Sequence, residues 1–287
     1  MVTIDLRKKL RNILKQKPDF SFEADIIITH VTNLPKSKWL LKDDISEKFS
    51  KECLNLAKRR KNGEPLQYLL GTWEFYGIPI KVGKGVLVPR PETETVVETV
   101  LRLAKKASKI LDLCAGSGCI SAAIAKNLPD CDISALELSD QAIEYAEKNL
   151  SNFKSNAKIL KLDVLDERSV ENFRDIDIIV CNPPYLTQND MKNLQDELKH
   201  EPKMALFGGR DGLMFYRQIA KIWKKALKPN GLIIFEIGWS QKALVDEILI
   251  KNGYINTKTI KDPCGKDRVV LGQKPQSNLK FKEKNHG

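Results

Sequence analysis

The 287-residue sequence lacks several features that would assign it to whole classes of proteins. It has no run of the roughly 18 apolar residues that a membrane helix needs, and charges interrupt the apolar residues at its N-terminus. Histidine is scarce, with three residues, and the six cysteines form no Cys-x-x-Cys pair. These absences argue against a membrane protein, a secretory signal and a zinc site. We therefore expect a cytoplasmic protein without a structural or catalytic metal.

Acidic residues are in deficit at the two ends of the chain. The formal net charge is +11; residues 1–61 hold 15 Lys and Arg against 8 Asp and Glu, whereas residues 62–272 hold 29 against 28. Basic ends can attract nucleic acid or an acidic partner. However, they contain few aromatic side chains that could stack on bases, and solvated Lys-rich helix faces explain the same charge. Composition leaves nucleic acid open as a partner without requiring it.

The first 70 residues are expected to form a small helical domain. Apolar residues recur at helical spacing in 2–17 and 43–61, and shorter helices are expected at 22–31 and 37–41. The following segment, 71–94, mixes β-forming residues with glycine and proline, which predicts a β-hairpin or ribbon. We take 71–90 as the connector to a second domain.

From residue 91 onward, strand-like apolar runs alternate with helical segments. Strands are expected at 109–114, 131–138, 157–164, 176–182, 231–238 and 267–273, with helices between them. Continuous apolar strands alternating with helices predict a parallel sheet covered on both faces. The expected fold class is therefore α/β: a doubly wound, mostly parallel sheet over 91–273, with the last two strands as an edge hairpin. We expect a seven-stranded sheet, one strand more than these six apolar runs. The basic tail, 274–287, has no periodicity and is expected to be disordered.

A short glycine-containing loop, DLCAGSGCIS, follows the first of these strands. Gly116 and Gly118 would let the backbone turn tightly and approach a ligand at the carboxyl edge of the sheet. Ser121 stands where a dinucleotide-binding fingerprint requires its third glycine. A pyrophosphate cradle is therefore not favoured.

Acidic residues end the next two strands at the same edge. Glu137 follows Gly118 by 19 residues, a spacing at which a carboxylate binds both hydroxyls of a ribose. Asp163 is placed to accept a hydrogen bond from an adenine amino group. Either acid could instead cap a helix, but the three strand ends in order favour a nucleoside cofactor without a diphosphate. S-adenosylmethionine fits this description.

The fourth strand ends in Asn182, and Pro183, Pro184 and Tyr185 follow. The Asn182 carbonyl could accept one N–H of a substrate amide or amine, and the rigid Pro183 carbonyl could accept the other. These two bonds would turn the nitrogen lone pair toward the cofactor methyl group, and Tyr185 could lie against the planar substrate group. A simple turn explains the same letters, but their position after the fourth strand favours methyl transfer to nitrogen. Cys181 alternates with Asn182, so it should point into the sheet and is not a candidate nucleophile.

Four stretches of the sequence together resemble the release factor glutamine methyltransferases, the PrmC/HemK family. They are EPLQYLLGTWEFYGIPIKVGKGVLVPRPETE, DLCAGSGCIS, CNPPY and EPKMALFGGRDGLMFYRQI, and the resemblance extends over residues 1–272. NPPY is shared with adenine-N6 methyltransferases, whereas PRPETE and GGRDGL are more specific to this family. Four positions depart from its usual pattern: Glu137 stands where many members carry Asp, Val164 stands where some relatives carry an aromatic residue, and Cys114 and Ala115 occupy positions often held by Gly and by Thr or Ser.

The resemblance implies a protein-(glutamine-N5) methyltransferase that uses S-adenosylmethionine. Its substrate would be the glutamine of the Gly-Gly-Gln motif in class 1 peptide chain release factors. We expect residues 1–70 to dock this substrate, and we expect a monomer that does not require nucleic acid. By motif match, the catalytic residues would be Asn182, Pro183, Pro184 and Tyr185. The cofactor-binding residues would be Asp112, Gly116, Ser117, Gly118, Cys119, Ile120, Glu137, Asp163, Val164 and Asn182.

Two other classes of function remain open at this point. The NPPY tetrapeptide and the positive charge also suit an adenine-N6 nucleic-acid methyltransferase, although no separate target-recognition domain is evident. A nucleic-acid-binding or scaffold protein with a vestigial pocket is the non-enzymatic alternative. The intact glycine loop, Glu137 and Asn182 argue against such decay.

Overall fold

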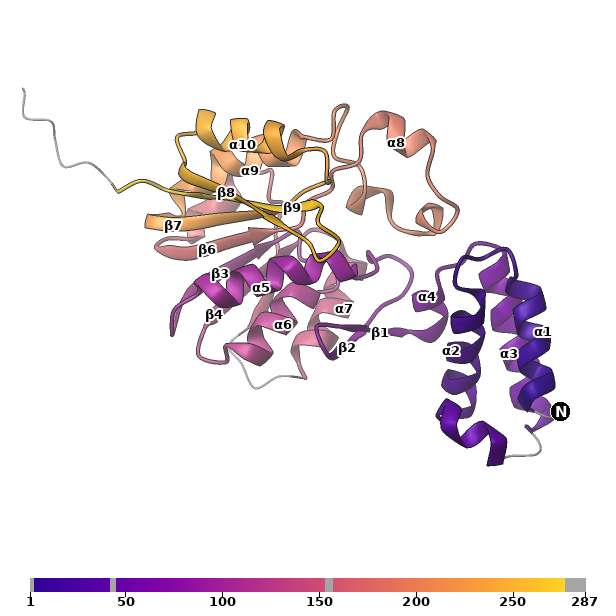
Figure 1. The fold of residues 1–287 in the computed structure, drawn as a ribbon. Helices are drawn as coiled ribbons and strands as arrows, with labels where there is room; N and C mark the ends of the chain where they lie inside the picture. Colours follow the sequence, from indigo (N-terminus) through magenta and orange to yellow (C-terminus); the bar gives the residue numbers. More distant parts are fainter. Residues whose placement is uncertain (1–2, 42–44, 153–156, 277–287) are drawn as a thin grey trace, which may run out of the picture.

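A computed structural model of the chain describes residues 3–41, 45–152 and 157–276 (Figure 1). Its N-terminal part is helical, as expected. Helices α1 (Thr3–Leu14), α2 (Phe20–Thr32) and α3 (Glu47–Lys61) pack around a shared apolar core, with the 3₁₀ helix η1 (Lys36–Leu41) and the short α4 (Leu66–Leu70) beside them. Most of the tail predicted to be disordered, 274–287, lies outside the described residues.

A β-hairpin joins these helices to the rest of the chain. Strands β1 (Thr72–Phe75) and β2 (Ile78–Lys81) pair antiparallel across a two-residue turn at Tyr76 and Gly77, both of which have positive φ. The hairpin is shorter than the predicted ribbon, because residues 82–90 leave it and run along the sheet domain. The 3₁₀ helix η2 (Pro91–Thr93) then leads into α5 (Glu94–Leu103).

Seven strands within the described residues form one sheet, in the order β5-β4-β3-β6-β7-β9-β8. Their bounds are β3 (Lys109–Leu113), β4 (Asp132–Glu137), β5 (Lys158–Lys161), β6 (Ile176–Cys181), β7 (Leu227–Glu236), β8 (Ile255–Lys261) and β9 (Asp267–Gln273). Strands β3 to β7 run parallel, and β9 is antiparallel to both β7 and β8. The predicted fold class is confirmed.

The edge of this sheet differs from the prediction. The strands predicted at 231–238 and 267–273 do pair antiparallel, as β7 and β9, but the edge hairpin is β8–β9. Strand β8 reads INTKTIK and is mostly exposed or half-buried, so it has no continuous apolar run to reveal it. An edge strand with one partner does not need such a run.

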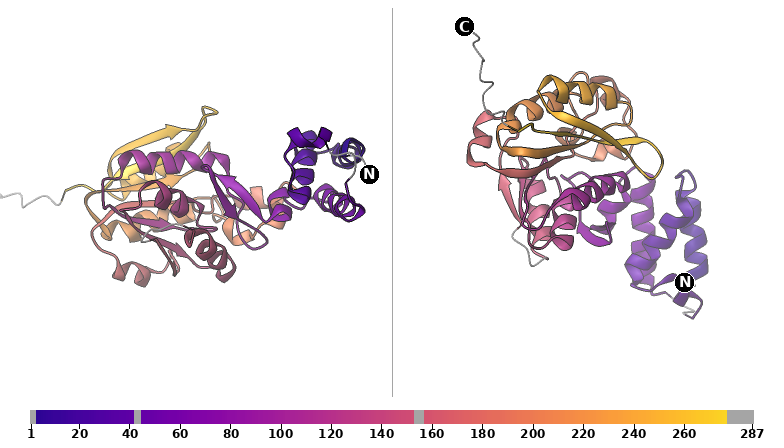
Figure 2. Two further views of the ribbon diagram at one scale, coloured as in Figure 1. Left: turned by 90° about the horizontal axis from the view of Figure 1, so that it is seen from below. Right: turned by 60° about the vertical axis from the view of Figure 1, so that its left-hand side comes forward.

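Helices cover both faces of the sheet (Figures 1 and 2). Helices α5, α6 (Cys119–Asn127) and α7 (Asp140–Leu150) pack on one face, together with the β1–β2 hairpin. Helices α9 (Met214–Ile222) and α10 (Lys242–Lys251), with the 3₁₀ helices η3 (Glu167–Asn172) and η6 (Trp223–Lys225), pack on the other. Among the described residues, no helix combines the length and apolarity needed to cross a membrane.

The strand order places a crevice at the carboxyl ends of β3 and β6. The chain moves outward from β3 to β4 and β5 and then returns to β6 on the other side of β3. At such a reversal the two loops that leave the sheet diverge, and a ligand can enter between them. Over this edge lies the bridging segment, residues 186–207, which contains α8 (Gln188–Lys192), η4 (Leu198–His200) and η5 (Lys203–Ala205). It contacts the N-terminal part of the chain: Glu197 pairs with Arg60 of α3 at 2.7 Å and with Lys17, between α1 and α2, at 3.4 Å.

Candidate active site

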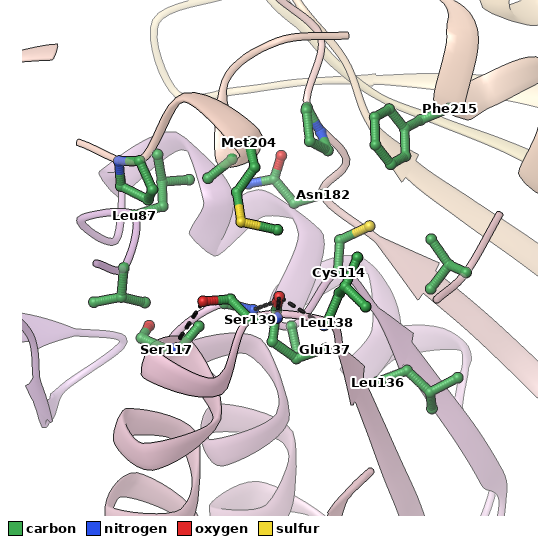
Figure 3. A pocket seen from close by; sticks show the side chains of 18 of the residues that line it. Leu87, Cys114, Ser117, Leu136, Glu137, Leu138, Ser139, Asn182, Met204 and Phe215 are labelled. Carbon is green, nitrogen blue, oxygen red and sulfur yellow. Dashed lines mark hydrogen bonds between the residues drawn. The ribbon is translucent and has the colours of Figure 1, made fainter. Parts of the chain in front are cut away.

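A cavity of about 640 Å³ lies at the carboxyl edge of the sheet. Figure 3 shows side chains of Leu87, Met204, Asn182 and Glu137 around it. Its walls come from residues 85–90 and Thr93, the loop after β3, the ends of β4 and β5, and the end of the bridging segment with Phe215. The crevice that the strand order requires is thus a cavity with largely apolar walls.

The loop after β3 turns through three residues with positive φ. Cys114, Gly116 and Gly118 have φ of 60°, 56° and 71°. A Cβ on Gly116 would meet nothing within 4 Å, so its backbone is open to a ligand, whereas a Cβ on Gly118 would lie 3.1 Å from the Ala146 side chain in α7. The structure therefore places a cysteine in a conformation that favours glycine. Cys114 is one of the positions at which the sequence departs from the pattern of the family that it resembles.

Asp112 and Ser121 fix this loop from below. Both are fully buried, and the Asp112 Oδ2 atom accepts hydrogen bonds from the Ser121 amide at 3.2 Å and hydroxyl at 2.7 Å. Burial raises the pKa of Asp112 to about 7. Within the described part of the chain, neither Asp112 nor Gly118 is among the cavity-lining residues. Their contact with α6 and α7 indicates that they hold the loop, while Gly116, Ser117, Cys119 and Ile120 face the cavity.

Glu137 ends β4 on the floor of the cavity. Its Oε2 atom accepts a hydrogen bond from the Gly116 amide at 2.8 Å. Its Oε1 atom accepts from the Leu138 and Ser139 amides, labelled in Figure 3, at 2.8 and 2.9 Å. These three donors hold the carboxylate in one place. A carboxylate has about four lone-pair sites, so it can still accept from a ligand hydroxyl.

Asp163 and Val164 follow β5 and line the same cavity. Asp163 Oδ1 accepts a hydrogen bond from the Leu165 amide at 2.8 Å, the local turn that a strand-end acid commonly makes. Val164 is held through its carbonyl, which accepts from the Trp223 indole N–H at 2.9 Å. Both residues are therefore placed by the fold at the cavity wall.

Asn182 follows β6 and faces the cavity, and its Nδ2 atom donates to the Thr93 hydroxyl at 3.4 Å. Of the residues that follow it, Pro184 borders the cavity. Pro183 is buried and Tyr185 half-buried, and among the described residues neither lines it. The Tyr185 ring packs into the core beside α9, and burial raises the pKa of Tyr185 to about 12. Cys181 is fully buried, and burial raises the pKa of its thiol well above the usual range, which does not suit a nucleophile.

The GGRDGL motif packs against the turn that follows Asn182. A Cβ on Gly208 would lie 2.6 Å from the Tyr185 Cα atom, and one on Gly212 would lie 2.3 Å from the Tyr185 carbonyl oxygen. The Gly208 amide also donates to the Leu186 carbonyl at 2.9 Å. Only glycine allows this approach of two backbones, so the GGRDGL motif has a structural role at the site.

Sequence reasoning missed the wall formed by residues 85–90 and 202–207. A buried carboxylate, Glu201, ties these two segments together: its Oε1 atom lies 2.5 Å from Arg90 Nη2, and its Oε2 atom accepts from the Val88 amide at 3.1 Å. Thr93, Leu87, Met204 and Phe215 were likewise not predicted to line the site. Their only signal in the sequence was the family resemblance. Leu87 and Thr93 lie in the stretch that ends in PRPETE, and Met204 and Phe215 lie in the stretch that begins with EPKM.

The fold and the domain content define the class of protein. The crystal structure of a methyltransferase from Pyrococcus furiosus superposes with a TM-score of 0.53 over 69% of this chain and 90% of that one, at 22% sequence identity. The family model for the methyltransferase small domain matches residues 93–215, and that for the PrmC N-terminal domain matches residues 5–71. The chain is a methyltransferase.

Closer relatives identify its family. The release factor glutamine methyltransferase of Thermodesulfovibrio yellowstonii is 41% identical over 94% of this chain and 98% of its own length. That of Clostridium botulinum is 36% identical over 96% of this chain and 100% of its own length. The chain belongs to the release factor glutamine methyltransferase family, which confirms the assignment made from its motifs.

Proposed function

We propose that this protein transfers a methyl group from S-adenosylmethionine to the side-chain amide nitrogen of a glutamine, that of the Gly-Gly-Gln motif in class 1 peptide chain release factors. The observation that carries the proposal is the position of Asn182. Its amide faces a cavity that is also lined by Glu137 and by the open backbone at Gly116. Family membership supports the choice of substrate.

The residues of the cavity fit the proposed cofactor. Glu137 would hold the ribose hydroxyls, Asp163 and Val164 would lie near the adenine, and the loop from Gly116 to Ile120 would follow the remainder of the molecule. The uncovered Gly116 backbone supports this fit, since nothing lies within 4 Å of the Cβ position. When bound, S-adenosylmethionine supplies an electrophilic methyl group on a sulfonium sulfur. The largely apolar walls would keep water away from it.

Asn182 and Pro183 would orient the substrate. The Asn182 side-chain carbonyl would accept one N–H of the glutamine amide and so hold the nitrogen in the orientation required for attack. The Pro183 backbone carbonyl would accept the other N–H, which requires the substrate to reach past the described residues that line the cavity, since Pro183 is not among them. The amide nitrogen becomes acidic only as it gains the methyl group, so no strong base is needed beforehand, and its proton leaves to water. Pro184 and Tyr185 would hold the turn that follows Asn182. Stacking of Tyr185 on the substrate amide stays a prediction.

We propose further that the N-terminal helices dock the release factor and that the protein acts as a monomer. The docking proposal is supported by two links between these helices and the cavity walls. The Tyr68 hydroxyl donates to the Val86 carbonyl at 2.5 Å, and Arg60 pairs with Glu197 of the bridging segment. A protein bound to the helices would therefore lie beside the cavity mouth.

A methyl-transfer assay with labelled cofactor tests the proposed function directly. Release factor, its Gln→Ala variant in the Gly-Gly-Gln motif, and double-stranded DNA are offered to the full chain in parallel. We expect label on the unchanged release factor alone. Label on DNA would support an adenine-N6 methyltransferase instead, and equal label on both release factors would show that the motif glutamine is not the acceptor.

A further inference from the structure

Asn182 is held from one side by a buried threonine. Thr93 is 2% exposed, stands at the start of α5 and lines the cavity, and its hydroxyl oxygen accepts a hydrogen bond from Asn182 Nδ2 at 3.4 Å. The Asn182 side chain has one N–H₂ group and one carbonyl oxygen, which point in opposite directions from the amide carbon. If the N–H₂ group faces Thr93, the carbonyl oxygen must face away from it.

A buried carboxylate, Glu236, lies close to both Thr93 and Asn182. Cys181 of β6 pairs with Phe235 of β7, so the next residues along the two parallel strands, Asn182 and Glu236, are neighbours at the sheet edge. Glu236 is 1% exposed, and its carboxyl group lies close enough to the Thr93 hydroxyl for that group to lower its pKa. Within the described residues its Oε2 atom has no hydrogen-bond partner. The Thr93 hydroxyl is therefore a donor within reach of this carboxylate.

A hydroxyl group has a single hydrogen to donate. When Thr93 donates it to an ionised Glu236, the Thr93 oxygen can only accept from Asn182. We propose that Glu236 and Thr93 form a relay that fixes the orientation of the Asn182 amide, so that its carbonyl oxygen faces the substrate nitrogen. The inference rests on the proposed function and makes Thr93 and Glu236 positioning residues for it. The reversed amide would present N–H donors to a substrate N–H₂ group, with which they cannot bond.

Burial and the charged groups around Glu236 determine the pH at which its carboxyl group ionises. Burial raises the pKa of Glu236 to about 7; the nearby carboxylate of Glu92 also raises it, while Thr93, Arg268 of β9 and Arg90 lower it. Tyr216 of α9 and the Tyr185 ring also face it, and the Tyr216 hydroxyl donates to the Glu236 backbone carbonyl at 2.9 Å. The relay requires the ionised carboxylate, so the variants are compared at about pH 8.

The test compares Thr93→Val with Thr93→Ser in the release-factor assay. Valine keeps the shape of threonine without the hydroxyl, and serine keeps the hydroxyl. We expect Thr93→Val to lower kcat by about tenfold or more, the effect of one lost orienting hydrogen bond, with KM for both substrates within about twofold of the wild type. Thr93→Ser should restore most of the rate. Melting temperature and cofactor binding of each variant are measured alongside, with Thr93→Ala as a second hydroxyl-free variant should valine prevent folding.

A double-mutant cycle tests the link to Glu236. Glu236→Leu should slow the wild-type background but change kcat by less than about twofold in the hydroxyl-free background, because the relay is already broken there. A hydroxyl-free variant with wild-type kcat, a serine variant as slow as the hydroxyl-free one, or equal effects of Glu236→Leu in both backgrounds would overturn the inference. The same assay also shows whether the wild type labels the motif glutamine. Absence of that label would contradict the proposed function, whereas the variants test the relay alone.

Discussion

The carboxylate of Glu137 accepts a hydrogen bond from the Gly116 amide at 2.8 Å and so joins the end of β4 to the loop after β3. The loop after β3 is thereby held against the end of β4. The same carboxylate is the proposed acceptor for the ribose hydroxyls. One side chain would therefore shape the cofactor site and also contact the cofactor.

Replacing Glu137 should weaken cofactor binding more than it weakens the fold. Glu137→Ala removes the proposed ribose acceptor and also releases the Gly116 amide. We expect affinity for S-adenosylmethionine to fall by about 10- to 100-fold, because hydrogen bonds to charged groups contribute about 1.5–3 kcal/mol each. Glu137→Gln keeps one acceptor oxygen, so its affinity for S-adenosylmethionine should lie between those of the wild type and Glu137→Ala. Titration calorimetry measures this, and an alanine variant with wild-type affinity would exclude Glu137 from the cofactor site.

Asn182→Ala should separate substrate orientation from cofactor binding. The side chain is proposed to hold the glutamine amide, so its loss should abolish detectable methyl transfer. Cofactor affinity should stay within about threefold, since Glu137 and the glycine loop remain. The two quantities are measured by label incorporation and by calorimetry on the same preparation. A loss of cofactor affinity as large as the loss of rate would contradict the assigned role.

The elements predicted best from the sequence are strands that are buried on both faces. Strands β3, β4 and β6 are covered on both faces, so each reads as a continuous apolar run. Glu137 and Asn182 could be placed because parallel strands deliver their last residues to one edge. Strand β8 was missed, since an edge strand can be polar.

The missed part of the site lies in segments without a periodic pattern. Leu87, Thr93, Met204 and Phe215 belong to loops or helix starts that reach the cavity through tertiary contacts. The pairing of Arg90 with Glu201 joins residues 111 positions apart. No local propensity encodes such a contact, so these walls became visible only in the folded chain.

Glu201→Ala should destabilise the protein and loosen the cavity wall. The glutamate side chain is 1% exposed, while Arg90 is 29% exposed, so the variant leaves a partly buried cation and the Val88 amide without their acceptor. We expect the free energy of unfolding to fall by about 3 kcal/mol, the lower end for breaking a buried ion pair. Urea denaturation measures it. Glu247→Ala, which breaks an exposed pair with Lys251, is the control and should change little.

Removing residues 1–70 should affect a protein substrate and spare a short peptide. If the N-terminal helices dock the release factor, the shortened enzyme should have a KM for the whole factor raised by about tenfold or more. Its KM for a Gly-Gly-Gln peptide should stay nearly the same, because the peptide reaches only the cavity. Loss of Tyr68 and Arg60 also removes contacts to residues 82–90 and 186–207, so circular dichroism must first show a folded protein. Equal KM values for the release factor before and after removal would refute the docking role.

Two buried carboxyl groups should make the protein less stable as the pH rises toward neutral. Burial raises the pKa of Asp112 from 3.8 to about 7 and that of Glu236 from 4.5 to about 7. Between these values the folded chain keeps protons that the unfolded chain has lost, so the free energy of unfolding should fall as pH rises from about 4.5 to about 7. The stabilisation is fully present below the unfolded values. Carboxylates with a lowered pKa, such as Asp25 and Asp211, act below about pH 4 and do not oppose this trend.

Asp112→Asn isolates one of the two groups. Asparagine keeps an oxygen that can accept from Ser121 but does not ionise, so the variant should lose roughly half of the decline between about pH 4.5 and about pH 7. It should also be more stable than the wild type at about pH 8, where the wild-type carboxylate is charged and buried. Urea denaturation of both proteins across this range measures the two slopes. Equal slopes would mean that Asp112 is ionised at the same pH in the folded and unfolded chains, and its burial would then not control its protonation.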